Sequence, residues 1–485
     1  MPKIFSFMRF LPAILLAFAL SSASAEEAKG VLRLLPGDAV TEHSIATAKG
    51  KLTYTATAGT LPFYDQSGEQ SAAVFYTAYV AKDAGANRPL TFVFNGGPGA
   101  ASAFLHLGLV GPRILDLGPD SHDAARAELR DNPDTWLAFT DLVLIDPIGT
   151  GWSRAAKPDE AKNFWNVSAD ASAMAKAVAL YVAHKNRAAS PKYLLGESYG
   201  GFRAAKTARA LQRDQGITIS GIVMLSPLLE GWLTFGDDGS PLRAALQLPS
   251  LAAAELERRQ AFTPEALTAA EKFALTDYLV TLAAKPPQGE AAKAFYQHVA
   301  DMTGLPLDSV TRARGFIPGF VKGLHAADHK IVSRYDVTFA VDDPYPESRS
   351  GNGGDPILDG VTRAYGGAFA AYARNELGFK TDITYSLLAD VQWDWKGGRT
   401  QASSEDDLRT LLAFGPSFRL LIAHGLSDMV TPYAMTRYVL DHMPPADPPE
   451  RVQLKLYRGG HMIYLDPQSR KAFSADAAAF YRGGE

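Results

Sequence analysis

Apolar residues along the chain alternate between two spacings over most of its length. Short strand-like runs, most of them largely apolar, occur at 90–94, 141–147, 192–196, 217–225, 418–423 and 452–457. Near-continuous apolar runs of this length are typical of strands buried on both faces. The segments at 169–188 and 200–215 instead carry their apolar residues at helical spacing. This alternation predicts an α/β fold with a mostly parallel sheet and helices on both of its faces.

The ends of this pattern define the expected domains. Residues 51–57 and 73–80 are rich in β-branched and aromatic residues on either side of a turn, which predicts antiparallel strands. From about residue 236 to 403 the strand-helix alternation is lost, and helical patterns mix with turn-rich stretches. We therefore expect a core in two parts, 26–235 and 404–485, with residues 236–403 inserted between them as a mainly helical cap.

The N-terminus has the three parts of a secretory signal peptide. Lys3 and Arg9 precede an apolar run from Phe10 to Leu20, and Ala23-Ser24-Ala25 follows as an A-x-A cleavage site. We predict that residues 1–25 are removed and that the protein is exported, to the periplasm or the medium. An uncleaved anchor is the alternative, but the apolar run is shorter than the roughly 20 residues that span a bilayer.

Composition narrows the classes of function. The 485 residues are 47% hydrophobic, and their net charge is −4, so the chain lacks the basic excess typical of nucleic-acid binding. It has no cysteine, which excludes disulfides, thiolate catalysis and cysteine-bound zinc. We expect no metal ion and no cofactor, and composition does not indicate an oligomeric state.

One strand-to-helix junction carries a serine in a G-x-S-x-G pattern. Gly196-Glu197-Ser198-Tyr199-Gly200 follows the apolar run at 192–196 and opens a helical segment, the context of a nucleophile elbow. In an elbow the serine occupies a tight turn, so the residues two places away must lack bulk, and the helix N-terminus faces the reacting carbonyl. Ser198 is therefore the predicted nucleophile, with a plain glycine-rich helix start as the alternative.

A serine hydroxyl needs a base to become a nucleophile. His461 follows the strand at 452–457, and Asp428 follows the strand at 418–423. Both should lie at the carboxyl ends of parallel strands, the sheet edge where open α/β sheets bind ligands. The chain order Ser, Asp, His is that of α/β-hydrolases. We predict His461 as general base and Asp428 as its orienting partner, with His424 as a rival base and a turn aspartate and a capping histidine as the alternatives.

The predicted oxyanion needs two backbone donors. One should be the N–H of Tyr199, directly after the nucleophile, and the other should come from the loop Asn95-Gly96-Gly97-Pro98-Gly99 after an early strand. Paired glycines allow a backbone to approach a substrate closely. We favour Gly97 as the second donor, with Gly96 as the rival and a plain turn as the alternative.

Together these blocks resemble the serine carboxypeptidase family of the α/β-hydrolase superfamily. The segments at 95–99, 146–153 and 196–201, the Asp428 loop and the segment at 459–462 match the family's blocks in order, in a chain without cysteines. The resemblance implies release of C-terminal amino acids from peptide substrates through an acyl-enzyme, with Gly97 and Tyr199 as oxyanion donors. It also implies that Asn95 and Glu197 bind the substrate's free carboxylate.

The sequence departs from the family at two positions of the carboxylate site. The family uses an asparagine, two glutamates that share a proton, and a tryptophan; Val93 stands at the tryptophan position and Leu109 at the second glutamate. A lone Glu197 is expected to be ionised, since an unperturbed glutamate has a pKa of about 4.3. Arg113 and Arg203 are candidate compensating cations, but we expect each of them to make a structural ion pair instead. We expect exopeptidase activity with a weaker preference for acid pH.

Two other functions stay open. An esterase or acyltransferase would use the same acyl-enzyme, because the cap decides which acceptor enters. A non-catalytic binding protein on this fold is the alternative from another class. Met462, beside His461, predicts an apolar wall for the leaving residue, with mere packing as the alternative.

Overall fold

A ten-stranded mixed sheet forms the centre of the computed structural model, which describes residues 30–48, 50–82, 85, 87–118, 124–317, 319–348 and 354–483. The strand order is β1-β2-β3-β7-β4-β9-β10-β13-β14, and β8 pairs with β3 beside this path. Strands β7 to β14 of this order run parallel, whereas β1, β2, β3 and β8 pair antiparallel with their neighbours. The strands are β1 (Ala39–Thr47), β2 (Gly50–Tyr64), β3 (Gln70–Ala81), β4 (Leu90–Phe94), β7 (Asp141–Ile145), β8 (Arg154–Ala155), β9 (Lys192–Glu197), β10 (Gly221–Leu225), β13 (Arg419–Gly425) and β14 (Val452–Tyr457).

This topology confirms the predicted α/β fold with a mostly parallel sheet. Every residue of β4, β7, β9 and β10 is buried, as parallel strands covered on both faces should be. The antiparallel strands expected before residue 90 are β2 and β3. The edge strand β1 was not predicted, because only Ile45 among its residues is buried. Its strand conformation follows from pairing with β2 rather than from an apolar pattern.

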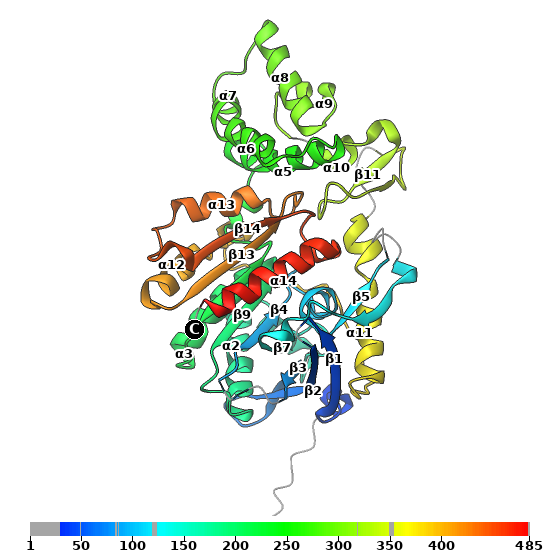
Figure 1. Cartoon of the computed structure of the whole chain (residues 1–485), viewed down its shortest axis with the longest axis vertical. Helices are drawn as coiled ribbons and strands as arrows, with labels where there is room; N and C mark the ends of the chain where they lie inside the picture. The colour runs from blue at the N-terminus through cyan, green and yellow to red at the C-terminus, as the bar shows by residue number, and fades with distance from the viewer. Residues whose placement is uncertain are drawn as a thin grey trace, which may run out of the picture.

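Helices cover both faces of the sheet over two separate apolar cores. The helices α2 (Val167–His184), α3 (Tyr199–Asp214), α12 (Glu405–Phe414) and α13 (Tyr433–His442) pack on one face. The other face carries α11 (Ala364–Asn375), α14 (Pro467–Arg482), which crosses in front of the sheet in Figure 1, and the π-helical turn η2 (His106–Val110). Successive strand residues enter opposite cores, as Phe92 and Val93 do.

A helical lobe follows β10 and lies beyond α13 and β14, at the top of Figure 1. It has an apolar cluster of its own, in which Leu248, Tyr278 and Val299 are fully buried. The elements of the lobe are α5 (Pro241–Arg258), α6 (Pro264–Phe273), α7 (Leu279–Ala283), α8 (Gly289–Thr303), α9 (Leu307–Arg312), α10 (Phe320–Gly323), β11 (Lys330–Val332) and β12 (Ala340–Asp342). The short elements outside the lobe are α1 (Ala103–Leu105), α4 (Gly231–Thr234), β5 (Arg113–Asp116) and β6 (Glu128–Asp131). The domain boundaries expected at 235/236 and 403/404 stay a prediction. Not all of the expected insertion belongs to the lobe, since α11 packs on the main core.

The predicted signal peptide, residues 1–25, lies outside the described residues. Within the part of the chain that the structure describes, no helix has both the length and the apolar character needed to cross a bilayer.

Candidate active site

Ser198 lies between the end of β9 and the start of α3 in a strained backbone conformation. Its φ and ψ are 59° and −127°, and a positive φ outside glycine is uncommon and clusters at functional sites. A Cβ on Gly196 would come within 1.9 Å of the Gly200 carbonyl oxygen, and one on Gly200 within 2.6 Å of the Phe94 carbonyl oxygen. Gly196 is therefore required by the tightness of the turn itself, and Gly200 by its packing against the end of β4.

His461 and Asp428 form a buried hydrogen-bonded pair. The Nδ1 of His461 lies 2.8 Å from Oδ2 of Asp428, and the two side chains are 2% and 0% exposed. Asp428 also accepts hydrogen bonds from the backbone N–H groups of Val430 and Thr431 and from the Thr431 hydroxyl. This network fixes the orientation of the imidazole ring.

The charges of this pair shift both pKa values. Burial alone would lower the pKa of His461, but the charge of Asp428 and its hydrogen bond outweigh burial and raise it above the usual 6.5. Burial alone would raise the pKa of Asp428, but the charge and hydrogen bond of His461 outweigh that effect and lower it. The pair therefore favours an ionised carboxylate beside a histidine that readily accepts a proton.

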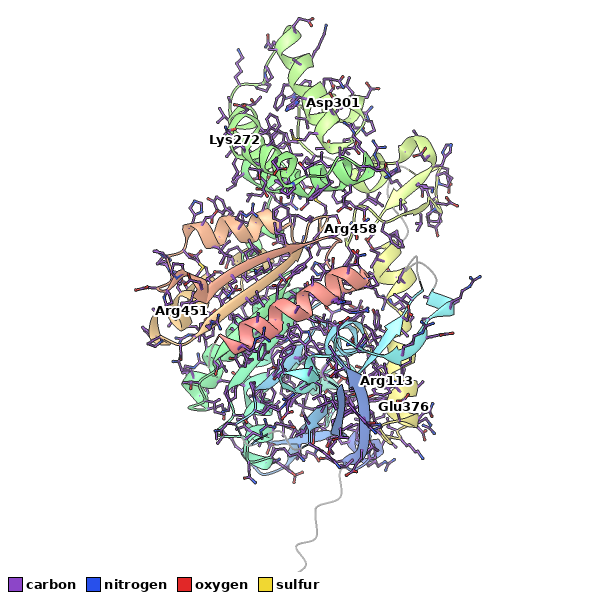
Figure 2. All side chains as sticks on the ribbon, in the orientation of Figure 1. Arg113, Lys272, Asp301, Glu376, Arg451 and Arg458 are labelled. Carbon is purple, nitrogen blue, oxygen red and sulfur yellow. The ribbon has the colours of Figure 1, made fainter. Side chains whose placement is uncertain are left out.

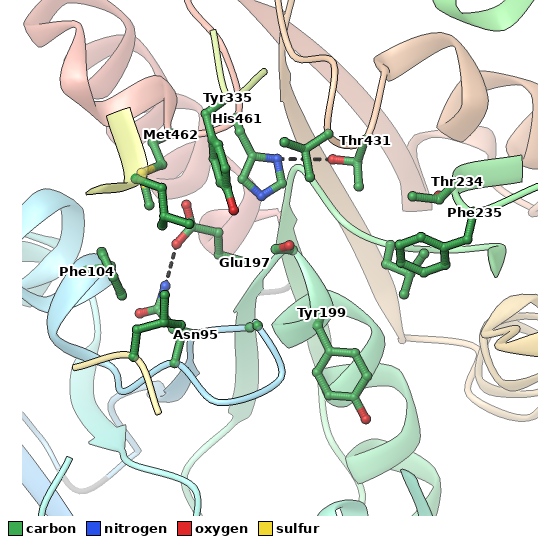
Figure 3. A pocket seen from close by; sticks show the side chains of 18 of the residues that line it. Asn95, Phe104, Glu197, Tyr199, Thr234, Phe235, Tyr335, Thr431, His461 and Met462 are labelled. Atoms are coloured by element: carbon green, nitrogen blue, oxygen red, sulfur yellow. Dashed lines mark hydrogen bonds between the residues drawn. The ribbon is translucent and has the colours of Figure 1, made fainter. Parts of the chain in front are cut away.

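One cavity collects most of the predicted site residues (Figure 3). Its lining includes Asn95, Gly96, Gly97, Glu197, Ser198, Tyr199 and His461. Asp428 does not line the cavity and lies behind His461, on the Nδ1 side of the ring. The structure thus brings together four loops, which follow β4, β9, β13 and β14 in the sheet.

The loop after β4 packs backbone to backbone against the start of α3. A Cβ on Gly96 would come within 2.7 Å of the Tyr199 nitrogen. Gly97 has a φ of 101°, in the region that favours glycine, and is followed by a cis peptide bond to Pro98. Tyr199 is the first residue of α3, where backbone N–H groups have no partner within the helix. Gly96, Gly97 and Tyr199 all line the cavity, so both segments contribute to its wall.

Glu197 is fully buried and hydrogen-bonded at the wall of the cavity. Its Oε2 accepts hydrogen bonds from the side-chain amide of Asn95 and, at 3.2 Å, from the hydroxyl of Tyr464. Burial raises the pKa of Glu197 to about 7, although the nearby His461 and both hydrogen bonds act in the opposite direction. The pKa of Glu197 therefore departs from the ordinary value expected from the sequence, because the low dielectric of the interior penalises the charged form.

Neither candidate cation contacts Glu197. Arg203 is 1% exposed, its Nε lies 2.7 Å from Asp170, and its Nη1 donates to the carbonyl oxygen of Asn95. Arg113 pairs with Asp131 at 2.6 Å and with Glu376 at 3.1 Å, at the edge of the molecule shown in Figure 2. Both arginines make structural ion pairs, as expected from the sequence.

The other positions singled out in the sequence lie away from the cavity. Val93 and Leu109 are fully buried in the apolar core of one sheet face. His424, the rival base, is also buried, and its Nε2 lies 2.8 Å from the Thr436 hydroxyl. Burial lowers the pKa of His424 to about 4. None of these three residues lines the cavity.

Sequence reasoning missed two tyrosines at the site. The carbonyl oxygen of Tyr335, in the segment after β11, accepts a hydrogen bond from the His461 backbone N–H at 2.6 Å, and its ring lies edge-on to the imidazole at 5.3 Å. Tyr464 follows His461 by three residues in the same loop. The position of Tyr464 near His461 was a usable signal, whereas nothing in the sequence linked Tyr335 to a loop more than a hundred residues away.

Apolar side chains form much of the remaining cavity wall. Phe104 and Met462 lie on the Asn95 and Glu197 side, and Phe235 lies on the Tyr199 side (Figure 3). Leu358, Leu388 and Trp395 add to this wall from the segment predicted as a cap. The cavity thus surrounds a few polar groups with apolar surface, as small-molecule and peptide-end sites commonly do.

A histidine pair elsewhere also escaped the sequence analysis. His325 and His329 are four residues apart with Asp328 between them, a spacing that metal ligands use. His325 Nδ1 lies 3.5 Å from Asp328. Among the described residues, however, no three histidine, aspartate or glutamate side chains are grouped as a metal site would require.

Comparison with known proteins finds a family match in the first part of the core. A model of the serine carboxypeptidase family matches residues 50–230. The retinoid-inducible serine carboxypeptidase of Mus musculus is 32% identical over 120 residues, 24% of this chain and 24% of that protein. Serine carboxypeptidase-like 41 of Arabidopsis thaliana is 28% identical over 164 residues, 32% of this chain and 34% of that protein. The matches thus span about a quarter to a third of these relatives' own length.

The similarity in fold extends over most of the chain. The crystal structure of Kex1Δp, a prohormone-processing carboxypeptidase from Saccharomyces cerevisiae, superposes with a TM-score of 0.54 at 16% identity, covering 89% of this chain and 91% of that one. At this identity the likeness concerns the fold alone. The fold, the family model and the relatives agree with the resemblance of the sequence blocks. Residues 50–230 are therefore similar to the serine carboxypeptidase family, and the fold of the whole chain resembles that of a carboxypeptidase of known structure.

Proposed function

We propose that this protein is a serine-type carboxypeptidase that releases C-terminal amino acids from peptides through an acyl-enzyme. One observation carries the proposal: His461, hydrogen-bonded to Asp428, lines the same cavity as Ser198, and the buried Glu197 and Asn95 line it too. The first three residues supply acyl-transfer chemistry, and the last two supply a polar pair suited to a peptide's terminal carboxylate.

In the acylation step, the Ser198 hydroxyl attacks the carbonyl carbon of the last peptide bond, and His461 takes its proton through Nε2. Asp428 accepts the Nδ1–H of His461, holds the tautomer and stabilises the imidazolium. The N–H groups of Tyr199 and Gly97 donate to the oxyanion that forms. Preorganised donors of this kind commonly contribute the largest single part of catalysis.

Collapse of the tetrahedral intermediate releases the C-terminal amino acid. His461 returns the proton to the leaving nitrogen, the C–N bond breaks, and the shortened peptide stays esterified to Ser198. A water molecule then loses a proton to His461 and attacks the ester carbonyl. Release of the peptide acid returns the proton to Ser198, so the enzyme is regenerated without a cofactor.

Glu197 and Asn95 are proposed to recognise the carboxylate of the leaving residue. An ionised Glu197 would repel that group, whereas a protonated one donates a hydrogen bond to it. The burial that raises the Glu197 pKa to about 7 supports the protonated form at mildly acidic pH. No compensating arginine is then needed at the site.

The test compares a blocked dipeptide that has a free C-terminal carboxylate with the corresponding C-terminal amide. A carboxypeptidase should cleave the free acid with much the higher kcat/KM. Equal rates, together with fast turnover of simple esters, would instead identify an esterase or acyltransferase. Failure of a fluorophosphonate to label the wild type at Ser198 would indicate a non-catalytic binding protein.

We propose two further features with this function. Residues 236–403 form a cap between core segments 26–235 and 404–485, and the cap places Tyr335 and Trp395 at the cavity. The protein is exported after cleavage behind Ala25, so that its peptide substrates lie in the periplasm or the medium. N-terminal sequencing of the mature protein tests the cleavage site.

A further inference from the structure

The two oxygens of the buried Glu197 carboxyl differ in their hydrogen bonds. Its Oε2 accepts hydrogen bonds from the Asn95 side chain and the Tyr464 hydroxyl. Its Oε1 is buried and has no hydrogen-bond partner among the described residues. Burying a charged carboxylate oxygen without a hydrogen-bond partner costs free energy, so a proton or a ligand is expected to bind at Oε1.

Tyr464 reaches Glu197 through a gap in the neighbouring turn. Its side chain is 1% exposed, and a Cβ on Gly108 would come within 2.5 Å of its ring. The absence of a side chain at residue 108 therefore gives the phenol ring its place. The next residue, Leu109, is buried in the apolar core. A phenol rather than a second carboxyl thus faces Glu197.

Two donors on one oxygen decide where the carboxyl proton resides. The carbonyl oxygen of a protonated carboxyl is a better acceptor than its hydroxyl oxygen, so donors from Asn95 and Tyr464 favour the carbonyl at Oε2 and the hydroxyl at Oε1. Figure 3 shows the Glu197 carboxyl with Asn95 on one side and Tyr335 and Met462 on the other. The proton on Oε1 then lies on the side away from Asn95.

We propose that Tyr464 is a positioning residue for Glu197. Tyr464 and Asn95 both donate hydrogen bonds to Oε2, which leaves the Oε1–H group free to donate to the carboxylate of the leaving amino acid. This inference rests on the proposed carboxypeptidase function and deepens it. It assigns the recognition of the substrate's terminus to one protonated carboxyl held by a phenol, and makes recognition depend on the titration of a single acid.

The charged and titratable groups around Glu197 allow that titration to be followed. His461 and Asp428 face it from the loops after β14 and β13, and Tyr335, Tyr365 and Tyr464 face it from the lobe, α11 and the His461 loop. Burial raises the pKa values of the three tyrosines above the usual 10, so they stay neutral between pH 5 and 9. Asp428 stays ionised because its pKa is lowered. Only His461 and Glu197 then change charge in that range.

The decisive variant is Tyr464→Phe, with Tyr365→Phe as the matched control for loss of a buried hydroxyl. Donation by Tyr464 stabilises the carboxylate and lowers the Glu197 pKa, so its removal should raise that pKa. For the free-acid dipeptide, the fall of kcat/KM at alkaline pH should move upward by roughly 0.5–1 pH unit in Tyr464→Phe. It should stay in place in Tyr365→Phe. An unmoved alkaline limb in Tyr464→Phe, whatever happens to its stability, would overturn the inference.

A second measurement separates this inference from the proposed function. Infrared difference spectra of the free enzyme should show a protonated carboxyl band that Glu197→Gln lacks and that persists to higher pH in Tyr464→Phe than in the wild type. If the wild type fails to prefer the free acid over the amide, the proposed function fails, and the spectra still test the role of Tyr464. If the band titrates at the same pH in both proteins, Tyr464 does not position Glu197, even where the preference for free acids holds.

Discussion

The backbone of Gly96 lies directly against the peptide unit of Tyr199. A Cβ at residue 96 would come within 2.7 Å of the Tyr199 nitrogen and 2.6 Å of the Glu197 carbonyl oxygen. The loop after β4 and the turn after β9 are neighbours because those two strands pair in parallel, with Phe94 opposite Gly196. This register is what a pair of backbone donors from the two segments requires.

Gly96→Ala should therefore damage catalysis more than folding. The added methyl group must push the loop away from Tyr199, which separates the proposed oxyanion donors, and kcat should fall by roughly 10²–10³-fold. Stopped-flow or steady-state assay with an ester substrate measures the change. The control is Gly367→Ala on α11, where an added Cβ has no neighbour within 4 Å. Equal activity of the two variants would argue against the donor assignment.

Asp428→Asn should keep Ser198 and His461 in place but lower kcat by about 10⁴-fold. The amide cannot stabilise the imidazolium and favours the wrong tautomer of His461. His424→Asn is the matched control, because His424 is buried nearby and bonds to Thr436 rather than lining the cavity. It should alter stability while leaving the rate of fluorophosphonate labelling within a few-fold of wild type. The reverse ranking would make His424 the base.

Ser198→Ala should abolish fluorophosphonate labelling and reduce kcat by roughly 10⁴–10⁶-fold. Only the hydroxyl group is removed, so the affinity for the free-acid dipeptide should be retained. Isothermal titration with the dipeptide measures that binding, and mass spectrometry of the labelled wild type identifies the modified residue. Label on a different serine would contradict the nucleophile assignment.

The pH dependence should differ between substrates with and without a terminal carboxylate. His461 acts as a base only when neutral, and its pKa is raised above 6.5, so activity on a simple ester should rise with pH through a midpoint above 6.5. For a free-acid peptide Glu197 must be protonated, so kcat/KM should also fall as pH rises through about 7. The expected profiles are a single rising limb for the ester and a narrow bell for the acid. A bell of the same shape for both substrates would exclude Glu197 as the source of the alkaline limb.

Arg203→Met should destabilise the protein by about 3–5 kcal/mol, because it leaves Asp170 charged, buried and unpaired. It also removes the donor to the Asn95 carbonyl oxygen, so kcat/KM for the free acid should fall as well. Urea unfolding followed by circular dichroism gives the free energy of unfolding. Lys293→Ala breaks a pair that is 75% and 88% exposed, and should change stability little. If the two variants lost similar free energies of unfolding, burial of the ion pair would not determine its contribution to stability.

Much of the core was predictable because local pattern and burial agree there. The strands β4, β7, β9 and β10 are mostly apolar and are buried along their whole length, so strand spacing and burial on both faces point to the same assignment. The edge strand β1 was missed, since only Ile45 of its residues is buried and pairing with β2 defines it.

The sequence by itself determined the order of the strands and helices and the loops in which Ser198, Asp428 and His461 lie, because apolar spacing and turn glycines are local properties. Only the tertiary structure decided what surrounds these side chains. It brought Tyr335 from the helical lobe onto His461, paired Arg203 with Asp170 instead of Glu197, and set Tyr464 against Glu197. It also raised the pKa of Glu197, because burial is a property of the packed chain and not of the residue.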